Sequence, residues 1–299
     1  MSQIFNYIKY KYKTNYVNLL GYEIAYIDEG KTSEVLLFIH GLGSYLKAWD
    51  RNIPELKNHF RCVAIDLPGY GKSSKQIHNG SIKFYTEFIN EFIKKLDLNN
   101  VTLVGHSMGG QIALSYALHY SAKVNNLILI APAGFETFTV DEIEKLQDLI
   151  SPELSFNASD EQVRFNYSVN FYKMPAEAEE MIKDRIIIKN DEEFYNHCQV
   201  VSSSLFSLLT EPVFDRLDQI DTPTLILFGK NDLFIPNRIV HKTNPGDVAI
   251  LGASKIKNSK LELLENCGHF LQYEKPDEFN SCVKIFFANN EVNSNHKSN

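Results

Sequence analysis

The chain has 299 residues, 44% of them apolar, so it is long enough to bury a full hydrophobic core. This length predicts one domain that carries an insertion. The net charge of −7 argues against binding to nucleic acid, which requires basic surfaces that displace counterions from phosphates. We therefore expect no nucleic-acid partner.

Cysteine spacing and the N-terminal composition bear on cofactors and location. The four cysteines are far apart and have no metal-ligand spacing: Cys62, Cys198, Cys267 and Cys282. They predict reduced thiols and no metal site. The N-terminus has no apolar signal-peptide region, and no run of about 18 apolar residues occurs. The expectation is a cytoplasmic protein without membrane insertion.

Two patterns near the N-terminus predict extended structure. Lysines and tyrosines alternate over residues 9–13, which favours an edge strand protected by lysines; the alternative is a contact with a membrane surface. Residues 17–30 have the period-two pattern and the central Gly21 of an antiparallel hairpin.

Six short apolar runs separated by helical stretches predict buried parallel strands. They occupy residues 35–41, 62–69, 101–107, 126–134, 224–232 and 261–269. Runs that are apolar on both faces are typical of an α/β sheet with helices on both sides. With the hairpin they predict a mixed, mostly parallel sheet whose chemistry gathers at the carboxyl ends of the strands.

One connection is too long for a simple crossover. After Ala133 about 80 residues pass before the next strand, whereas a crossover needs about a dozen. We predict an inserted helical lid of about four helices at 135–215, core segments at 1–134 and 216–288, and a flexible tail at 289–299. The predicted helix starts are Thr139 with Glu142, Ser159 with Gln162, Pro175, and Asn190 with Glu193.

The strongest local signal is Gly105-His106-Ser107-Met108-Gly109, between a predicted strand and a predicted helix. The pattern G-x-S-x-G in this context is a nucleophile elbow. The turn strains the serine backbone, and side chains two positions away would collide, which explains the glycines. Ser107 is therefore the predicted nucleophile, at a helix N-terminus that favours developing negative charge.

A serine nucleophile needs a base, and the base needs an acid that fixes its tautomer. Asp232 and His269 each follow a predicted strand, in the order Ser, Asp, His that accompanies a nucleophile elbow. We predict Asp232 as the acid and His269 as the base, with Glu136 as the alternative acid. His40 and His106 also lie at strand ends, but structural roles explain them better.

Acyl transfer also requires two backbone donors for the oxyanion, which favours a glycine-containing turn near the nucleophile. His40-Gly41-Leu42-Gly43 follows the first parallel strand. We assign the donors to the amides of Leu42 and Met108, and a hydrogen bond within the loop to His40. The alternative is a glycine turn without a catalytic role.

Five segments, in this order, resemble the α/β-hydrolase superfamily over nearly the whole chain outside the insertion: HGLGS, DLPGYGKSS, GHSMGG, FGKNDLFIP and CGHFLQYEKPDEF. The resemblance implies the α/β-hydrolase fold, an eight-stranded sheet, the triad and the oxyanion donors at the positions above. Haloalkane dehalogenases and epoxide hydrolases are excluded, because their nucleophile is aspartate. Residues 241–255 look like an extra loop between the acid and the base.

The composition of the lid bears on the substrate. Residues 136–215 include 17 acidic and 6 basic residues. Such a lid would repel coenzyme A, acyl carrier protein and sugar phosphates, which favours neutral substrates. Its aromatic side chains pack the lid helices, and some should line an apolar acyl pocket. Arg164 and Arg185 either face solvent or anchor a substrate carboxylate.

The sequence thus predicts a serine hydrolase that cleaves a carboxylic ester of a neutral, partly apolar small molecule through an acyl-enzyme on Ser107. We expect a monomer or homodimer and no cofactor. The alternatives are a carbon–carbon bond hydrolase, a lactonase, an amidase or a lyase on the same triad. A slow or non-catalytic binding protein is a further alternative.

Overall fold

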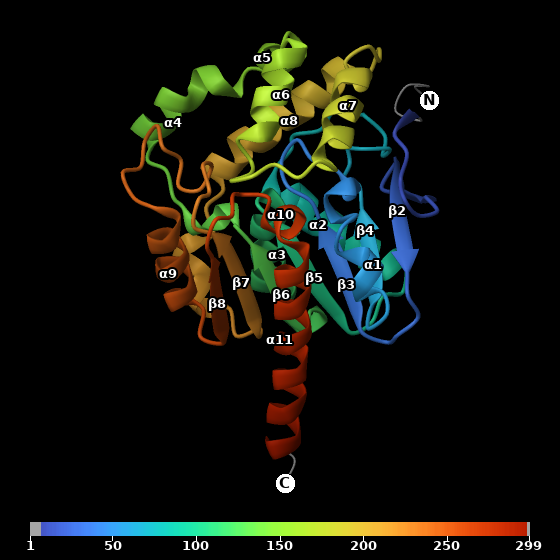
Figure 1. The fold of residues 1–299 in the computed structure, drawn as a ribbon, viewed down its shortest axis with the longest axis vertical. Helices are drawn as coiled ribbons and strands as arrows, with labels where there is room; N and C mark the ends of the chain where they lie inside the picture. The colour runs from blue at the N-terminus through green and yellow to red at the C-terminus, as the bar shows by residue number, and fades with distance from the viewer. Residues whose placement is uncertain (1–6, 298–299) are drawn as a thin grey trace.

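The computed structural model describes residues 7–297, with side chains described through residue 290. The strands are β1 (Asn15–Leu19), β2 (Tyr22–Glu29), β3 (Val35–Ile39), β4 (Arg61–Ile65), β5 (Val101–His106), β6 (Asn126–Ile130), β7 (Thr224–Gly229) and β8 (Ser259–Leu264). They form an eight-stranded sheet in the order β1-β2-β4-β3-β5-β6-β7-β8 (Figure 1). β2 runs antiparallel to β1 and β4, and the other neighbours are parallel. The predicted hairpin and mostly parallel sheet are confirmed.

Helices cover both faces of the sheet because the central strands are apolar on both sides. Leu37 and Ile39 of β3 pack into a core on the side of α2, α3 and α9. Leu36 and Phe38 pack on the opposite side with α1 and α11, which crosses the sheet in Figure 1. The helices outside the insertion are η2 (Leu46–Trp49), α1 (Ile53–Leu56), α2 (Ile82–Lys95), α3 (Met108–Tyr120), η3 (Ser121–Lys123), α9 (Pro245–Lys255), α10 (Leu271–Glu274) and α11 (Pro276–Lys297).

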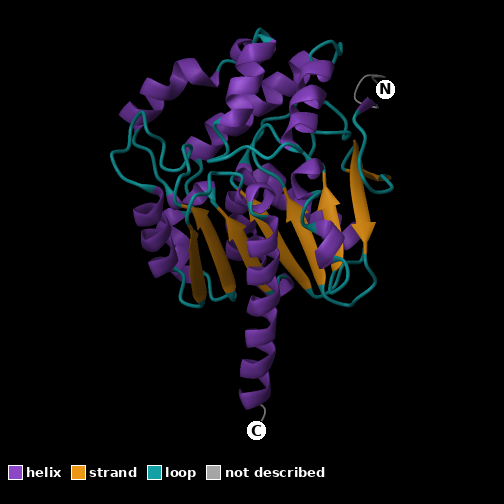
Figure 2. Ribbon diagram, viewed as in Figure 1, coloured by secondary structure: helices purple, strands orange, loops and turns teal. Residues whose placement is uncertain are grey.

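The long connection between β6 and β7 is helical. It contains η4 (Ala133–Phe135), α4 (Val140–Leu146), η5 (Gln147–Ile150), α5 (Pro152–Phe156), α6 (Asp160–Ser168), α7 (Ala178–Ile188), α8 (Phe194–Thr210) and η6 (Phe214–Gln219). It therefore has five α-helices where about four were expected. Figure 2 shows α4 to α8 over the carboxyl ends of the parallel strands.

Two of the predicted helix starts are found in the insertion. Thr139 and Glu142 form a reciprocal capping box at α4. Ser159 caps α6 by accepting from the Gln162 amide at 3.2 Å, but the Gln162 side chain turns to Asn166 instead of completing a box.

The other two predicted starts are wrong by about three residues. α7 begins at Ala178, so Pro175 lies before the helix. α8 begins at Phe194, and Asp191, one residue after Asn190, accepts a hydrogen bond from the Glu193 amide at 2.8 Å. Proline and asparagine restrict the backbone only locally, whereas packing of the insertion decides where each helix begins.

Residues 9–13 are not a strand, and the sheet edge is β1. The tyrosines of this segment contact residues outside the edge of the sheet. Tyr10 donates a 2.5 Å hydrogen bond to the buried Asp66 carboxylate, and the Lys57 ammonium lies 4.7 Å from the centre of the Tyr12 ring. These contacts hold the segment against neighbouring loops, away from the edge-strand position.

Two other segments differ from their predictions. The predicted extra loop at 241–255 contains α9, which is the crossover helix between β7 and β8. The predicted tail at 289–299 is helical as far as Lys297, because α11 continues through it; residues 298–299 lie outside the described part. Among the described residues, no helix has both the length and the hydropathy needed to cross a bilayer.

Candidate active site

Ser107 lies in a strained turn between β5 and α3. Its backbone has φ +54° and ψ −114°, outside the regions that a non-glycine residue usually adopts. A Cβ atom at Gly105 would lie 2.3 Å from the carbonyl oxygen of Gly109, and one at Gly109 would lie 2.1 Å from that of Ile39. Only glycine therefore fits on either side of the serine, as the sequence pattern predicted.

Asp232 and His269 meet at the same edge of the sheet, although 37 positions separate them. His269 Nδ1 donates to Asp232 Oδ2 at 2.7 Å. The second oxygen, Oδ1, accepts from the amides of Phe234 at 2.7 Å and Ile235 at 3.0 Å. Asp232 is fully buried, so three donors satisfy a carboxylate without access to water. The bond uses Nδ1, so Nε2 is the nitrogen that can take a proton from a serine.

His106 brings the serine turn next to His269. Its Nε2 donates to the carbonyl oxygen of His269 at 3.0 Å, and the two ring centroids lie 4.7 Å apart. Burial, followed by the nearby His269, lowers the pKa of His106 well below its usual value. His106 is therefore neutral, and its contacts are structural.

The loop after β3 lies directly beside Ser107. A Cβ atom at Gly41 would lie 3.1 Å from the Ser107 Cβ atom. His40 donates from Nδ1 to the Gly41 carbonyl at 2.8 Å and accepts the amide of Leu67 at Nε2 at 3.1 Å, and burial lowers its pKa to about 4. The expected hydrogen bond of His40 within its loop is thus present.

The amides assigned to the oxyanion are available to bind a ligand. Met108 is the first residue of α3, where a helix amide has no intrahelical partner. Within residues 7–297, neither the Met108 amide nor the Leu42 amide donates to another backbone or side-chain group. Gly43, with φ +64°, provides the left-handed turn that follows Leu42.

The insertion contacts the site at two points that the sequence did not predict. The Arg185 guanidinium of α7 donates to the Gly43 carbonyl and, at 2.7 Å, to Nε2 of His197. The Phe270 amide donates to the Asn170 carbonyl at 3.0 Å. The insertion thereby holds both the loop after β3 and the loop that carries His269. No local pattern reveals such contacts, because they depend on how the helices pack.

Three other candidate residues have different partners. Glu136, the alternative acid, accepts a hydrogen bond from His241 Nδ1 at 2.6 Å instead of contacting His269. Arg164 forms an ion pair with Glu179 at 2.8 Å on the exposed surface of the insertion. Arg185, as described above, is engaged by main-chain and histidine acceptors.

Apolar side chains are exposed in the loop next to His269. The Phe234 ring centroid lies 5.2 Å from that of His269, and Phe234 and Leu233 are each 43% exposed. If His269 is the base, the exposed Phe234 ring beside it would favour a substrate with apolar groups.

The sheet order, the strained serine turn after β5 and the Asp–His pair after β7 and β8 define a hydrolase of the α/β type. A family model described as the alpha/beta hydrolase fold matches residues 34–181. The chain therefore has the α/β-hydrolase fold.

Similar proteins include hydrolases of more than one kind. The 2-hydroxy-6-oxononadienedioate/2-hydroxy-6-oxononatrienedioate hydrolase 1 of Pseudomonas putida is 29% identical over 90% of this chain and 93% of its own length. Human monoacylglycerol lipase ABHD6 is 29% identical over 95% of this chain and 85% of its own length. The solved structure of a probable hydrolytic enzyme from Pseudomonas aeruginosa superposes with a TM-score of 0.83 at 22% identity, covering 94% of this chain and 96% of that one. This last likeness concerns the fold alone.

Proposed function

We propose that the chain is a serine hydrolase that cleaves carboxylic esters of neutral, partly apolar substrates. Ser107 is the nucleophile, His269 the general base and Asp232 the acid that orients it. The observation that carries the proposal is the 2.7 Å bond between His269 Nδ1 and Asp232 Oδ2 next to a strained serine turn. The helices of 135–215 act as a lid over this site.

The proposed reaction has two acyl-transfer steps. The Ser107 oxygen attacks the ester carbonyl carbon while its proton moves to His269 Nε2. The amides of Leu42 and Met108 stabilise the charge on the carbonyl oxygen. When the tetrahedral intermediate collapses, the alcohol leaves with the proton from His269. Water, activated by the same histidine, then hydrolyses the acyl-enzyme, and Asp232 stabilises each imidazolium that forms.

Apolar groups and negative charge near the site favour neutral substrates. Phe234 offers apolar surface beside His269, and its neighbour Leu233 is also exposed. The insertion has 17 acidic and 6 basic residues over 136–215, which disfavours anionic substrates. The human relative named as a monoacylglycerol lipase supports an ester as the bond that is cleaved.

A second candidate is the hydrolysis of a carbon–carbon bond in a substrate with a carboxylate. The relative from Pseudomonas putida, named as a hydrolase of such an acid, favours it. The two lid arginines weigh against it, because Arg164 is paired with Glu179 and Arg185 with Gly43 and His197. Each arginine thus already has partners within the protein.

The test is hydrolysis of p-nitrophenyl esters from acetate to laurate by the wild type and by Ser107→Ala. The proposal predicts activity with a chain-length optimum that is lost in the variant. Wild-type activity no higher than that of Ser107→Ala would refute it. Carbon–carbon cleavage is then tested with a diketone that has a terminal carboxylate.

A further inference from the structure

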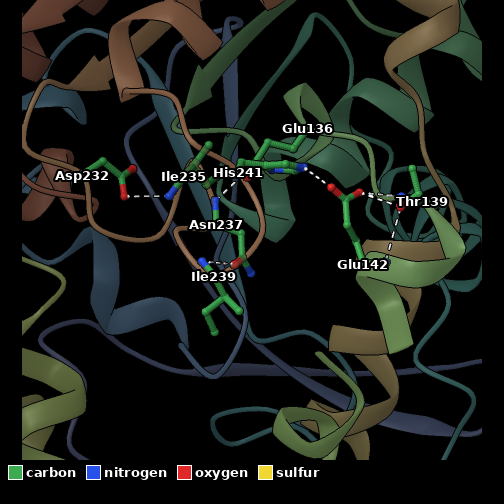
Figure 3. Close-up of polar contacts among 8 residues, drawn as sticks. All are labelled: Glu136, Thr139, Glu142, Asp232, Ile235, Asn237, Ile239 and His241. Carbon is green, nitrogen blue, oxygen red and sulfur yellow. Dashed lines mark hydrogen bonds and ion pairs between the residues drawn. The ribbon is translucent and has the colours of Figure 1, made fainter. Parts of the chain in front are cut away.

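The loop that follows the catalytic acid has no regular structure of its own. Residues 233–241 lie between Asp232 and α9 and form neither a helix nor a strand. This loop supplies the Phe234 and Ile235 amides that bind Asp232 Oδ1. Figure 3 shows the bond from Ile235. The position of the Asp232 carboxylate therefore depends on the contacts that hold this loop in place.

A single buried carboxylate holds the far end of this loop. Oε1 of Glu136 accepts the Asn237 amide at 2.9 Å and His241 Nδ1 at 2.6 Å. Between these two contacts, the His241 amide donates to the Asn237 carbonyl at 2.9 Å, which closes a turn. Glu136 comes from the first residues after η4, so the insertion begins at the point where it fixes the loop (Figure 3).

His241 also links the loop to α4, the first α-helix of the insertion. His241 Nε2 lies 3.7 Å from Glu142 Oε1, and the other oxygen of Glu142 accepts the Thr139 amide at 2.8 Å. The Phe138 ring packs on the imidazole at a centroid distance of 5.0 Å. His241 thus lies between two carboxylates, one buried and one at the start of α4.

An ion pair that only stabilised the protein surface would not require a buried Glu136 carboxylate. The Glu136 side chain is 6% exposed, and a buried carboxylate is costly unless it is paired. Burial raises the pKa of Glu136, while the bond to His241 opposes that shift and the negative charge of Asp232 adds to it. The pair therefore lies close enough to the catalytic acid for the two charges to interact.

We propose that Glu136 and His241 are positioning residues for Asp232, because together they hold the loop whose amides orient its carboxylate. This inference rests on the proposed serine-hydrolase function. The two residues contact the loop and have no contact with the reacting atoms, so they act through Asp232. They also link the acid to the start of the insertion through Glu142.

The test compares Glu136→Leu, which removes the acceptor oxygen for both Asn237 and His241, with His241→Phe, their double variant and the wild type. Phenylalanine keeps a ring against Phe138 and removes the hydrogen bond. Glu144→Gln is the matched control, because it removes an exposed carboxylate from α4. The first readout is the rate at which a fluorophosphonate probe labels Ser107 as a function of pH. The second is the far-downfield proton resonance of the His269–Asp232 hydrogen bond, with thermal unfolding measured in parallel.

We expect each single variant to slow labelling about tenfold and to shift or broaden the resonance. The double variant should be no slower than Glu136→Leu, because that change already removes the oxygen to which His241 donates. The pH midpoint of labelling should fall in Glu136→Leu, because less negative charge then stabilises the imidazolium. Glu144→Gln should match the wild type in every readout.

Labelling rates within twofold of wild type and an unchanged resonance would overturn the inference, even if thermal stability falls. Effects that multiply in the double variant would also overturn it. If Glu136→Leu does not fold, His241→Phe still tests the bond between His241 and Glu136, at a side chain that is 21% exposed. A wild type that resists the probe would refute the proposed function, whereas the resonance would still decide the positioning role.

Discussion

Replacing Asp232 with asparagine tests the proposed mechanism most directly. All three bonds to the carboxylate come from donors: His269 Nδ1 on one oxygen, and the amides of Phe234 and Ile235 on the other. Asparagine offers one acceptor oxygen and one NH₂ group. Either His269 Nδ1 or the two loop amides must therefore face the NH₂ group, which is itself a donor. Turning the NH₂ group toward the two loop amides leaves two buried donors unsatisfied, at a cost of about 1–3 kcal/mol each.

The less costly orientation places the NH₂ group against His269. Nδ1 must then accept a hydrogen bond, so the proton resides on Nε2 and the histidine cannot take the proton of Ser107. We expect kcat to fall about 10⁴-fold, which corresponds to about 5 kcal/mol in the activation free energy.

The assay is hydrolysis of the best p-nitrophenyl ester at pH 7, and the Ser107→Ala variant gives the background rate. The matched control is Asp221→Asn, because Asp221 is 73% exposed and lies outside the site. The control should retain wild-type kcat. Asp232→Asn activity within tenfold of wild type would refute the assignment of the acid.

Three further predictions concern the glycine turn, His40 and Arg185. Gly109→Ala should lower the free energy of unfolding by about 3 kcal/mol in denaturant titrations, because its Cβ would lie 2.1 Å from the Ile39 carbonyl oxygen; an unchanged midpoint would contradict this. Buried His40 has a pKa of about 4 against about 6.5 in the unfolded chain, so its stability contribution is present above pH 6.5 and falls by about 3 kcal/mol toward pH 4. His40→Gln should flatten that part of the stability profile, and an equally steep profile would argue against this source. Arg185→Met should lower kcat about tenfold by releasing the Gly43 carbonyl, and unchanged ester turnover would show that the contact is dispensable.

The sheet could be predicted because its signals are local. Central parallel strands are buried on both faces, so they are short apolar runs, and the serine turn requires glycine at Gly105 and Gly109 for steric reasons. The order of Asp232 and His269 followed from the same strand ends. These features depend on a few neighbouring residues each, which the sequence displays directly.

Features that depend on packing between distant segments were not predicted. Nothing near Arg185 or His241 indicates that one would contact Gly43 and the other Glu136. By contrast, α9 carried a readable start: Asn244 accepts from the Asp247 amide at 3.0 Å, and a proline follows it in the first turn. The segment was expected to be a loop because its length was compared with relatives, whereas its own capping residues indicated a helix.

Among its contacts with the core, the insertion holds three separate loops of the site, through Glu136, Asn170 and Arg185. It is therefore not an exchangeable module. A chimera that receives the 135–215 segment of a relative would lose these three contacts with the loops beneath it, whatever it gained in the proposed lid. Directed evolution of selectivity should keep these three anchor positions constant and vary the helix faces between them. Otherwise a substitution that alters specificity would also move the loops of the site and alter turnover.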